Sequence, residues 1–116
     1  MNIPENIADP RAYEFCYQPT LWPDLGGFQR EWWAYYDAME NLARRIIAAF
    51  GESLGLPSSY FDTFISQPIS ALRVMYYPPT VAHARVGQHR AGAHTDYGSL
   101  SILLPESGRS GLQISR

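Results

Sequence analysis

The sequence has a single cysteine and no long apolar run. Because Cys16 has no second cysteine to pair with, it cannot form a disulfide within the chain, which favours a reducing compartment. The opening residues MNIPENIADP lack the basic and apolar segments of a signal peptide. No apolar run approaches the roughly 20 residues of a membrane-spanning helix. We therefore expect a cytoplasmic protein without a membrane partner.

An excess of positive charge is also missing. The chain has 9 basic and 11 acidic residues, a net charge of -2, and no predicted element carries a basic stripe. A nucleic-acid partner is therefore not expected. The 116 residues are 46% hydrophobic and 17% charged, which is typical of one globular domain with a core of its own. The sequence does not indicate an oligomeric state.

The first 70 residues are predicted to form a loop and helical region. Four prolines interrupt residues 1–27, which are expected to be irregular. From residue 28 to about residue 54, apolar side chains recur at spacings of three and four, which predicts a long amphipathic helix. Gly55 and Pro57 provide its end. A short second helix is expected at about 60–66, and the aromatic stripe of the long helix is expected to pack in the core.

Residues 71–116 lose the helical period. The segments 71–77, 99–104 and 111–115 are rich in apolar residues and bounded by prolines or glycines, and each is predicted to be a strand. Residues 80–93 are predicted to form a long loop that carries His83 and His89. The spacing of these histidines with His94 does not follow that of a zinc finger, and we expect them to lie in solvent.

The triplet HTD places His94 and Asp96 two positions apart, just before an apolar segment. Residues at i and i+2 share a face only when the backbone is extended, as in a strand. An imidazole and a carboxylate on one face make up two of the three ligands in the two-histidine, one-carboxylate set that holds non-haem Fe(II). An ordinary polar turn is the alternative, because such triplets also occur by chance.

Several stretches together resemble one enzyme family. They are LWPD (21–24), LGLPSSYF (54–61), LRVMYYPP (72–79), GAHTDYG (92–98) and GLQ (111–113). In combination they resemble the isopenicillin N synthase-like 2-oxoglutarate/Fe(II)-dependent dioxygenases. The resemblance implies an α+β fold in which N-terminal helices (1–70) pack on part of a double-stranded β-helix (jelly roll, 71–116) that is incomplete in this chain.

The resemblance also implies a site. His94 and Asp96 would be the first two Fe(II) ligands. Tyr77 would contact the carboxylate of the co-substrate 2-oxoglutarate, although a half-buried strand aromatic is an equal alternative for this residue. The expected function is a 2-oxoglutarate- and Fe(II)-dependent oxidoreductase that couples decarboxylation of 2-oxoglutarate to oxidation of a small organic substrate.

The chain also departs from this family. The family has a second iron-binding histidine and an R-x-S pair further along the chain, and here no histidine follows His94. This departure predicts that the sequence is the middle part of a larger enzyme. The alternative is a truncated, catalytically inactive homologue that acts at most as a weak metal-binding or interaction module. A cupin-type jelly roll fits the long helix less well.

Overall fold

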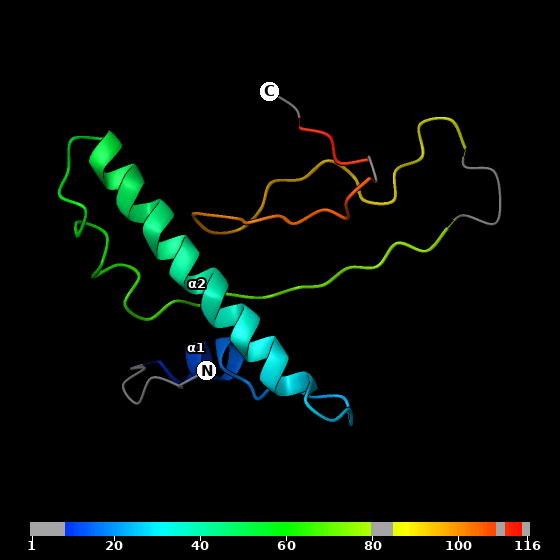
Figure 1. Ribbon diagram of the computed structural model, residues 1–116, viewed down its shortest axis with the longest axis horizontal. Helices are drawn as coiled ribbons and strands as arrows, with labels where there is room; N and C mark the ends of the chain where they lie inside the picture. Colours follow the sequence, from blue (N-terminus) through cyan, green and yellow to red (C-terminus); the bar gives the residue numbers. More distant parts are fainter. Residues whose placement is uncertain (1–8, 80–84, 109–110, 115–116) are drawn as a thin grey trace. The chain divides into compact units, whose positions relative to one another are not determined.

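The computed structural model describes residues 9–79, 85–108 and 111–114. These residues form two helices, α1 (Pro10–Cys16) and α2 (Phe28–Ser53), and no β-strand (Figure 1). The chain divides into two compact units, Met1–Met75 and Tyr76–Arg116, and both helices belong to the first unit. Neither of the helices formed by the described residues is long and apolar enough to cross a membrane.

Helix α1 lies in a stretch that the sequence predicted to be irregular, so that prediction is wrong for Pro10–Cys16. Asp9 caps the helix: its side-chain Oδ1 accepts a hydrogen bond from the backbone N–H of Arg11 at 2.9 Å. Pro10 occupies the first turn, where a missing N–H costs nothing and the fixed φ suits a helix. The pair Asp9-Pro10 was therefore a start signal for a helix rather than a break.

Helix α2 confirms the predicted long helix almost to the residue, since it spans Phe28–Ser53. Its end is a Schellman motif. The N–H of Leu56 donates to the carbonyl of Gly51 at 2.9 Å, and the N–H of Gly55 donates to the carbonyl of Glu52 at 3.0 Å. Gly55 has φ 73°, a left-handed conformation that glycine adopts without strain.

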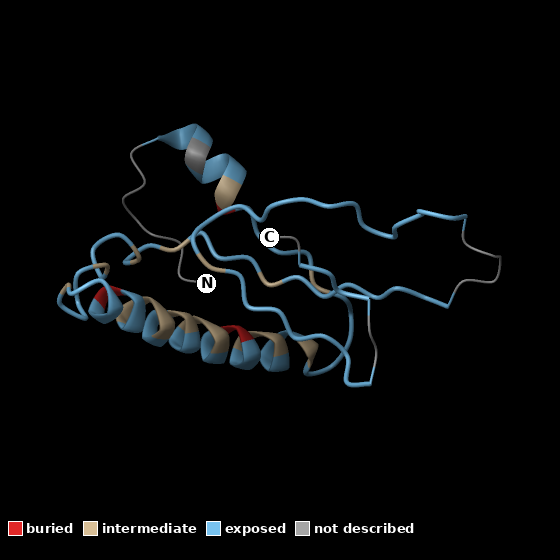
Figure 2. Ribbon diagram, turned by 90° about the horizontal axis from the view of Figure 1, so that it is seen from above, coloured by how far each residue is buried: buried red, intermediate tan, exposed pale blue. Residues whose placement is uncertain are grey.

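One side of α2 is covered and the other faces solvent, as the colouring of the helix in Figure 2 shows. Tyr36 and Gly51 are buried, and the half-buried residues include Trp32, Met39, Ala43, Ile46 and Ile47. Most of the predicted apolar stripe therefore packs inward, whereas Leu42 and Phe50 are exposed. At the start of the helix, Trp22 packs its ring against those of Phe28, Trp32 and Trp33, with centroid separations of 6.4, 6.2 and 5.6 Å.

The segment after α2 turns back along the helix (Figure 1). Residues 57–67 form successive turns rather than the predicted helix at 60–66, so that prediction is wrong. The hydrogen bonds of this segment are mostly those of turns between residues three apart, such as the bonds from the N–H of Tyr60 to the carbonyl of Pro57 at 2.9 Å and from the N–H of Asp62 to the carbonyl of Ser59 at 3.1 Å. The segment is also fixed by contacts with α2. A Cβ on Gly51 would lie 3.2 Å from the carbonyl oxygen of Pro57, so the turn rests directly on the glycine.

Tyr36 attaches the returning chain to the N-terminal half of α2. Its side chain is only 8% exposed, and its hydroxyl lies 3.3 Å from the carbonyl oxygen of Ser70 and 3.4 Å from Oε1 of Glu40. The hydroxyl can donate its one proton to either acceptor. Burial raises the pKa of Tyr36 above its usual 10.0, and the nearby Glu40 carboxylate acts in the same direction.

The described part of residues 71–116, most of which belong to the second unit, corrects the predicted fold class. The described residues of the segments 71–77, 99–104 and 111–115 contain no strand, so the predicted jelly-roll portion is wrong for this structure. A strand needs a partner with which to exchange backbone hydrogen bonds, and an alternating pattern of side chains does not by itself supply one. The described part of this unit instead contains turns, such as the one closed by the Gln88 N–H and the Arg85 carbonyl at 3.0 Å. Large apolar side chains here lie exposed, among them Leu103, Leu104, Leu112 and Ile114.

Candidate functional site

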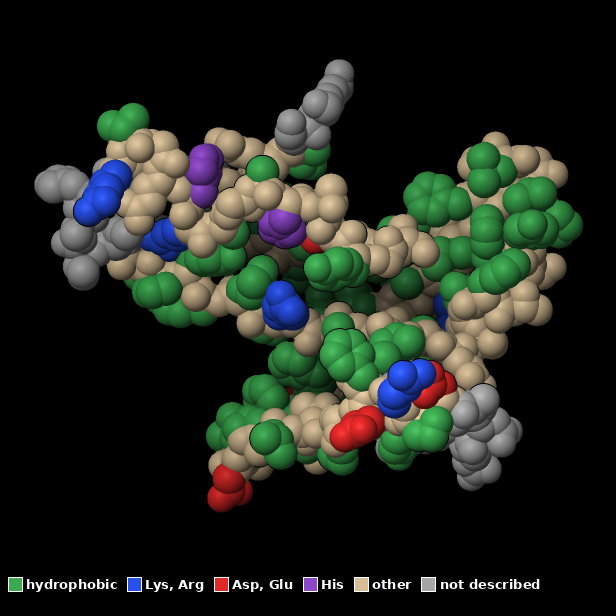
Figure 3. Space-filling view, turned by 180° about the vertical axis from the view of Figure 1, so that it is seen from behind, with side chains coloured by type: hydrophobic (Ala, Val, Ile, Leu, Met, Phe, Trp, Pro, Cys, Tyr) green, Lys and Arg blue, Asp and Glu red, His purple; other side chains and the backbone are tan. Residues whose placement is uncertain are grey.

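His94 and Asp96 lie in the second unit, in a stretch without regular secondary structure. The structure brings their side chains together, with Nε2 of His94 3.6 Å from Oδ1 of Asp96. The two side chains are 68% and 50% exposed, so both donor atoms can be reached from solvent. Figure 3 shows the histidine side chains of the described residues, in purple, at the surface.

The other ring nitrogen of His94 has a backbone partner. Nδ1 lies 2.9 Å from the carbonyl oxygen of Gly92. Metal-ligating histidines commonly make this type of contact, in which one nitrogen binds a carbonyl and the other the ion. No pattern of side chains in the sequence could have indicated this contact, because the partner is a main-chain atom.

The pair fits two positions around a divalent cation. With bonds of about 2.1 Å, two donors on one ion lie about 3.0 Å apart at a right angle and about 3.4 Å apart in a tetrahedral site. The observed 3.6 Å between Nε2 and Oδ1 is slightly longer, and a small rotation of either exposed side chain closes the difference. A neutral imidazole and a carboxylate together suit Fe(II) and related ions.

The described ranges contain no larger cluster of side chains that could hold a metal ion. Across residues 9–79, 85–108 and 111–114, no group of three or more His, Cys, Asp or Glu side chains is placed so as to hold a metal ion. His89 is exposed, as the sequence predicted, and His83 lies outside the described residues. The structure thus brings the predicted pair together, and within the described ranges no third such side chain completes a set that could hold a metal ion.

Tyr77 belongs to the same unit as the pair. Its side chain is 45% exposed, in the irregular stretch that ends at the two prolines 78 and 79. A contact between this hydroxyl and 2-oxoglutarate stays a prediction.

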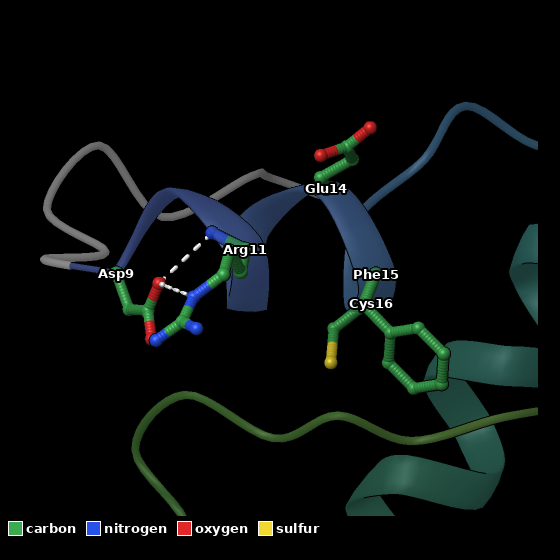
Figure 4. A pocket seen from close by; sticks show the side chains of 5 residues that line it. All are labelled: Asp9, Arg11, Glu14, Phe15 and Cys16. Carbon is green, nitrogen blue, oxygen red and sulfur yellow. Dashed lines mark hydrogen bonds and ion pairs between the residues drawn. The ribbon is translucent and has the colours of Figure 1, made fainter.

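A shallow pocket at α1 does not offer comparable chemistry. It is lined by Asp9, Arg11, Glu14, Phe15 and Cys16 (Figure 4). Two of its three charged groups already have structural roles, because Asp9 caps the helix and also lies 3.5 Å from Nε of Arg11. We therefore assign no function to this pocket.

Comparison with known proteins gives several relatives that are named as 2-oxoglutarate-dependent dioxygenases or oxidoreductases. The chain is 31% identical over 101 residues to a 2-oxoglutarate-dependent dioxygenase of Trichoderma harzianum, covering 84% of this chain and 31% of the relative. It is 36% identical over 116 residues to a 2-oxoglutarate-dependent dioxygenase of a Phoma species, covering 92% and 36%. A 2-oxoglutarate-Fe(II) type oxidoreductase of Aspergillus fumigatus is 34% identical over 120 residues, covering 94% and 34%.

The chain thus spans about a third of the length of these relatives. No family model matches the sequence. No solved structure matches it either.

Proposed function

We propose that this chain, which is related to the 2-oxoglutarate-dependent dioxygenases over most of its length, carries two of the Fe(II) ligands of a 2-oxoglutarate-dependent oxidoreductase. The observation that carries the proposal is the approach of His94 Nε2 and Asp96 Oδ1 to 3.6 Å. The similarity to proteins named as 2-oxoglutarate-dependent dioxygenases and as a 2-oxoglutarate-Fe(II) type oxidoreductase supports it independently. The substrate would be a small organic molecule.

In this proposal each residue has one task. Asp96 supplies a negative oxygen donor, and His94 supplies a nitrogen donor, and both side chains are exposed in the same irregular stretch. Bound Fe(II) would supply the activation of O₂ together with 2-oxoglutarate, which is chemistry that side chains cannot perform alone. Tyr77 would donate its hydroxyl hydrogen to a carboxylate of 2-oxoglutarate, orienting that molecule.

Two finer assignments belong to the same proposal. We place the chain in the isopenicillin N synthase-like branch, supported by the motifs GAHTDYG (92–98), LRVMYYPP (72–79) and LGLPSSYF (54–61). We also propose that residues 1–70 form the supporting helical region and residues 71–116 carry the ligands. A cytoplasmic location agrees with the single cysteine.

Fe(II) binding under anaerobic conditions tests the ligand assignment. His94→Ala and Asp96→Ala should each weaken Fe(II) binding at least about tenfold, because each removes one of two protein ligands. His89→Ala is the matched control, since it removes an exposed histidine of the same unit and should bind as the wild type does. Equal binding by the wild type and Asp96→Ala would contradict the assignment.

Release of labelled CO₂ from 2-oxoglutarate, in the presence of Fe(II), ascorbate and O₂, tests the activity. Turnover that is lost in His94→Ala and kept in His89→Ala would support the oxidoreductase. Fe(II) binding that depends on His94 and Asp96, without any CO₂ release by the wild type, would instead identify the chain as an inactive metal-binding homologue.

A further inference from the structure

We propose that the backbone carbonyl of Gly92 fixes the tautomer of His94, placing the ring proton on Nδ1 and leaving Nε2 as a free electron-pair donor. The tautomer is a property of the ring itself, and only the identity of the ion that Nε2 receives rests on the proposed function. Gly92 is thereby a positioning residue that acts through its main chain.

The contact at Nδ1 determines where the proton lies. A neutral imidazole has one N–H, and its other nitrogen is an acceptor. A carbonyl oxygen can only accept, so the 2.9 Å approach of Nδ1 to the Gly92 oxygen is a hydrogen bond only when Nδ1 carries the proton.

A second acceptor competes for the same proton. Oδ1 of Asp96 lies 3.6 Å from Nε2, which is beyond hydrogen-bonding distance, whereas the Gly92 oxygen is within it. The shorter contact therefore decides the tautomer. The result is an unprotonated Nε2 that faces a carboxylate oxygen, two electron-rich atoms that a cation between them would satisfy together.

The contact between Nδ1 of His94 and the carbonyl of residue 92 does not require a glycine at that position. A Cβ on Gly92 would meet no atom within 4 Å, and Gly92 is not among the glycines with positive φ. Gly92→Ala should therefore keep the carbonyl and the tautomer. Replacing Ala93 by lactic acid changes the amide between residues 92 and 93 into an ester, whose carbonyl is a weaker acceptor. That replacement perturbs the proposed contact and little else.

Nitrogen-15 NMR of the histidine rings of the full chain, at mildly alkaline pH, measures the tautomer directly. The His94 signals are identified by their loss in His94→Ala. We expect the Nδ1–H form in the wild type, in Gly92→Ala and in Asp96→Ala, and a shift toward the Nε2–H form in the ester variant. His89 is the internal reference, because within the described residues its ring has no hydrogen bond.

A predominant Nε2–H form of His94 in the wild type would overturn the proposal, as would an ester variant with an unchanged tautomer. Addition of Zn²⁺, a diamagnetic probe for the divalent ion, should shift Nε2 and leave Nδ1 protonated. A shift at Nδ1 would also overturn it. If the Nδ1–H form is found and neither nitrogen responds to Zn²⁺, the role of Gly92 is supported and the proposed function loses its histidine ligand.

Discussion

Removal of the Tyr36 hydroxyl tests whether the chain after α2 is held to the helix by this one side chain. Tyr36→Phe keeps the ring and deletes the oxygen that lies 3.3 Å from the Ser70 carbonyl and 3.4 Å from Oε1 of Glu40. A hydrogen bond of this kind contributes about 1 kcal/mol net. We therefore expect the free energy of unfolding to fall by about 1 kcal/mol, which lowers the melting temperature by about 4 °C.

The assay is urea and thermal unfolding at neutral pH, followed by the circular dichroism of the helices. Tyr35→Phe is the matched control. Tyr35 is next to Tyr36 in the sequence but is 40% exposed, and the substitution removes the same hydroxyl oxygen. The control should change the free energy of unfolding by less than about 0.5 kcal/mol. Equal losses in the two variants would refute the view that Tyr36 has a special role.

The pH dependence gives a second, independent check. Burial raises the pKa of Tyr36 above 10.0 in the folded chain, so the folded state holds this proton more tightly than the unfolded state does. The corresponding stability is fully present below pH 10 and is lost as the pH rises through the raised folded value. The difference between wild type and Tyr36→Phe should therefore shrink above pH 10, and a difference that grew there would contradict the assigned burial.

Two glycines give further predictions for the free energy of unfolding, measured by the same assay. Gly55→Ala should cost about 1 kcal/mol, because residue 55 has φ 73° in the motif that ends α2, whereas Gly26→Ala, at a position without positive φ, should cost nothing. Gly51→Ala should fail to give the gain of about 1 kcal/mol that alanine usually brings to a helix, because its Cβ would lie 3.2 Å from the Pro57 carbonyl oxygen. A clear stabilisation by Gly51→Ala would show that the turn at Pro57 does not rest on the helix.

The parts of the fold that the sequence predicted well are those that local signals determine. The spacing of apolar side chains and the Gly55 stop are both contained in the sequence around α2, and the helix begins and ends where they indicate. The helix α1 was missed although its signal is equally local, because Pro10 was interpreted as a break and not as a first-turn residue. The error lay in how Pro10 was interpreted, since the signal that starts α1 is contained in neighbouring residues.

The strands failed for a different reason. The apolar residues of segments such as 71–77 and 99–104, bounded by prolines or glycines, show that the side chains suit a sheet, but a sheet exists only where distant segments exchange backbone hydrogen bonds. The described residues of these segments are irregular, and large apolar side chains among them remain exposed. Local pattern could therefore identify the segments without determining their structure.

The approach of His94 and Asp96 does not require the strand that the sequence predicted after them. Alternation in a strand is one way to bring residues i and i+2 to the same side, and it motivated the choice of His94 and Asp96. Only one residue separates them, so a few backbone angles and the rotations of the two side chains set the distance between their donor atoms. This holds whether or not the segment pairs with another strand. The structure reaches 3.6 Å in an irregular stretch, with the ring held from its other side by the Gly92 carbonyl. The approach of these two side chains is thus a property of the local sequence GAHTD, and within the described residues no third His, Cys, Asp or Glu side chain joins them in a group that could hold a metal ion.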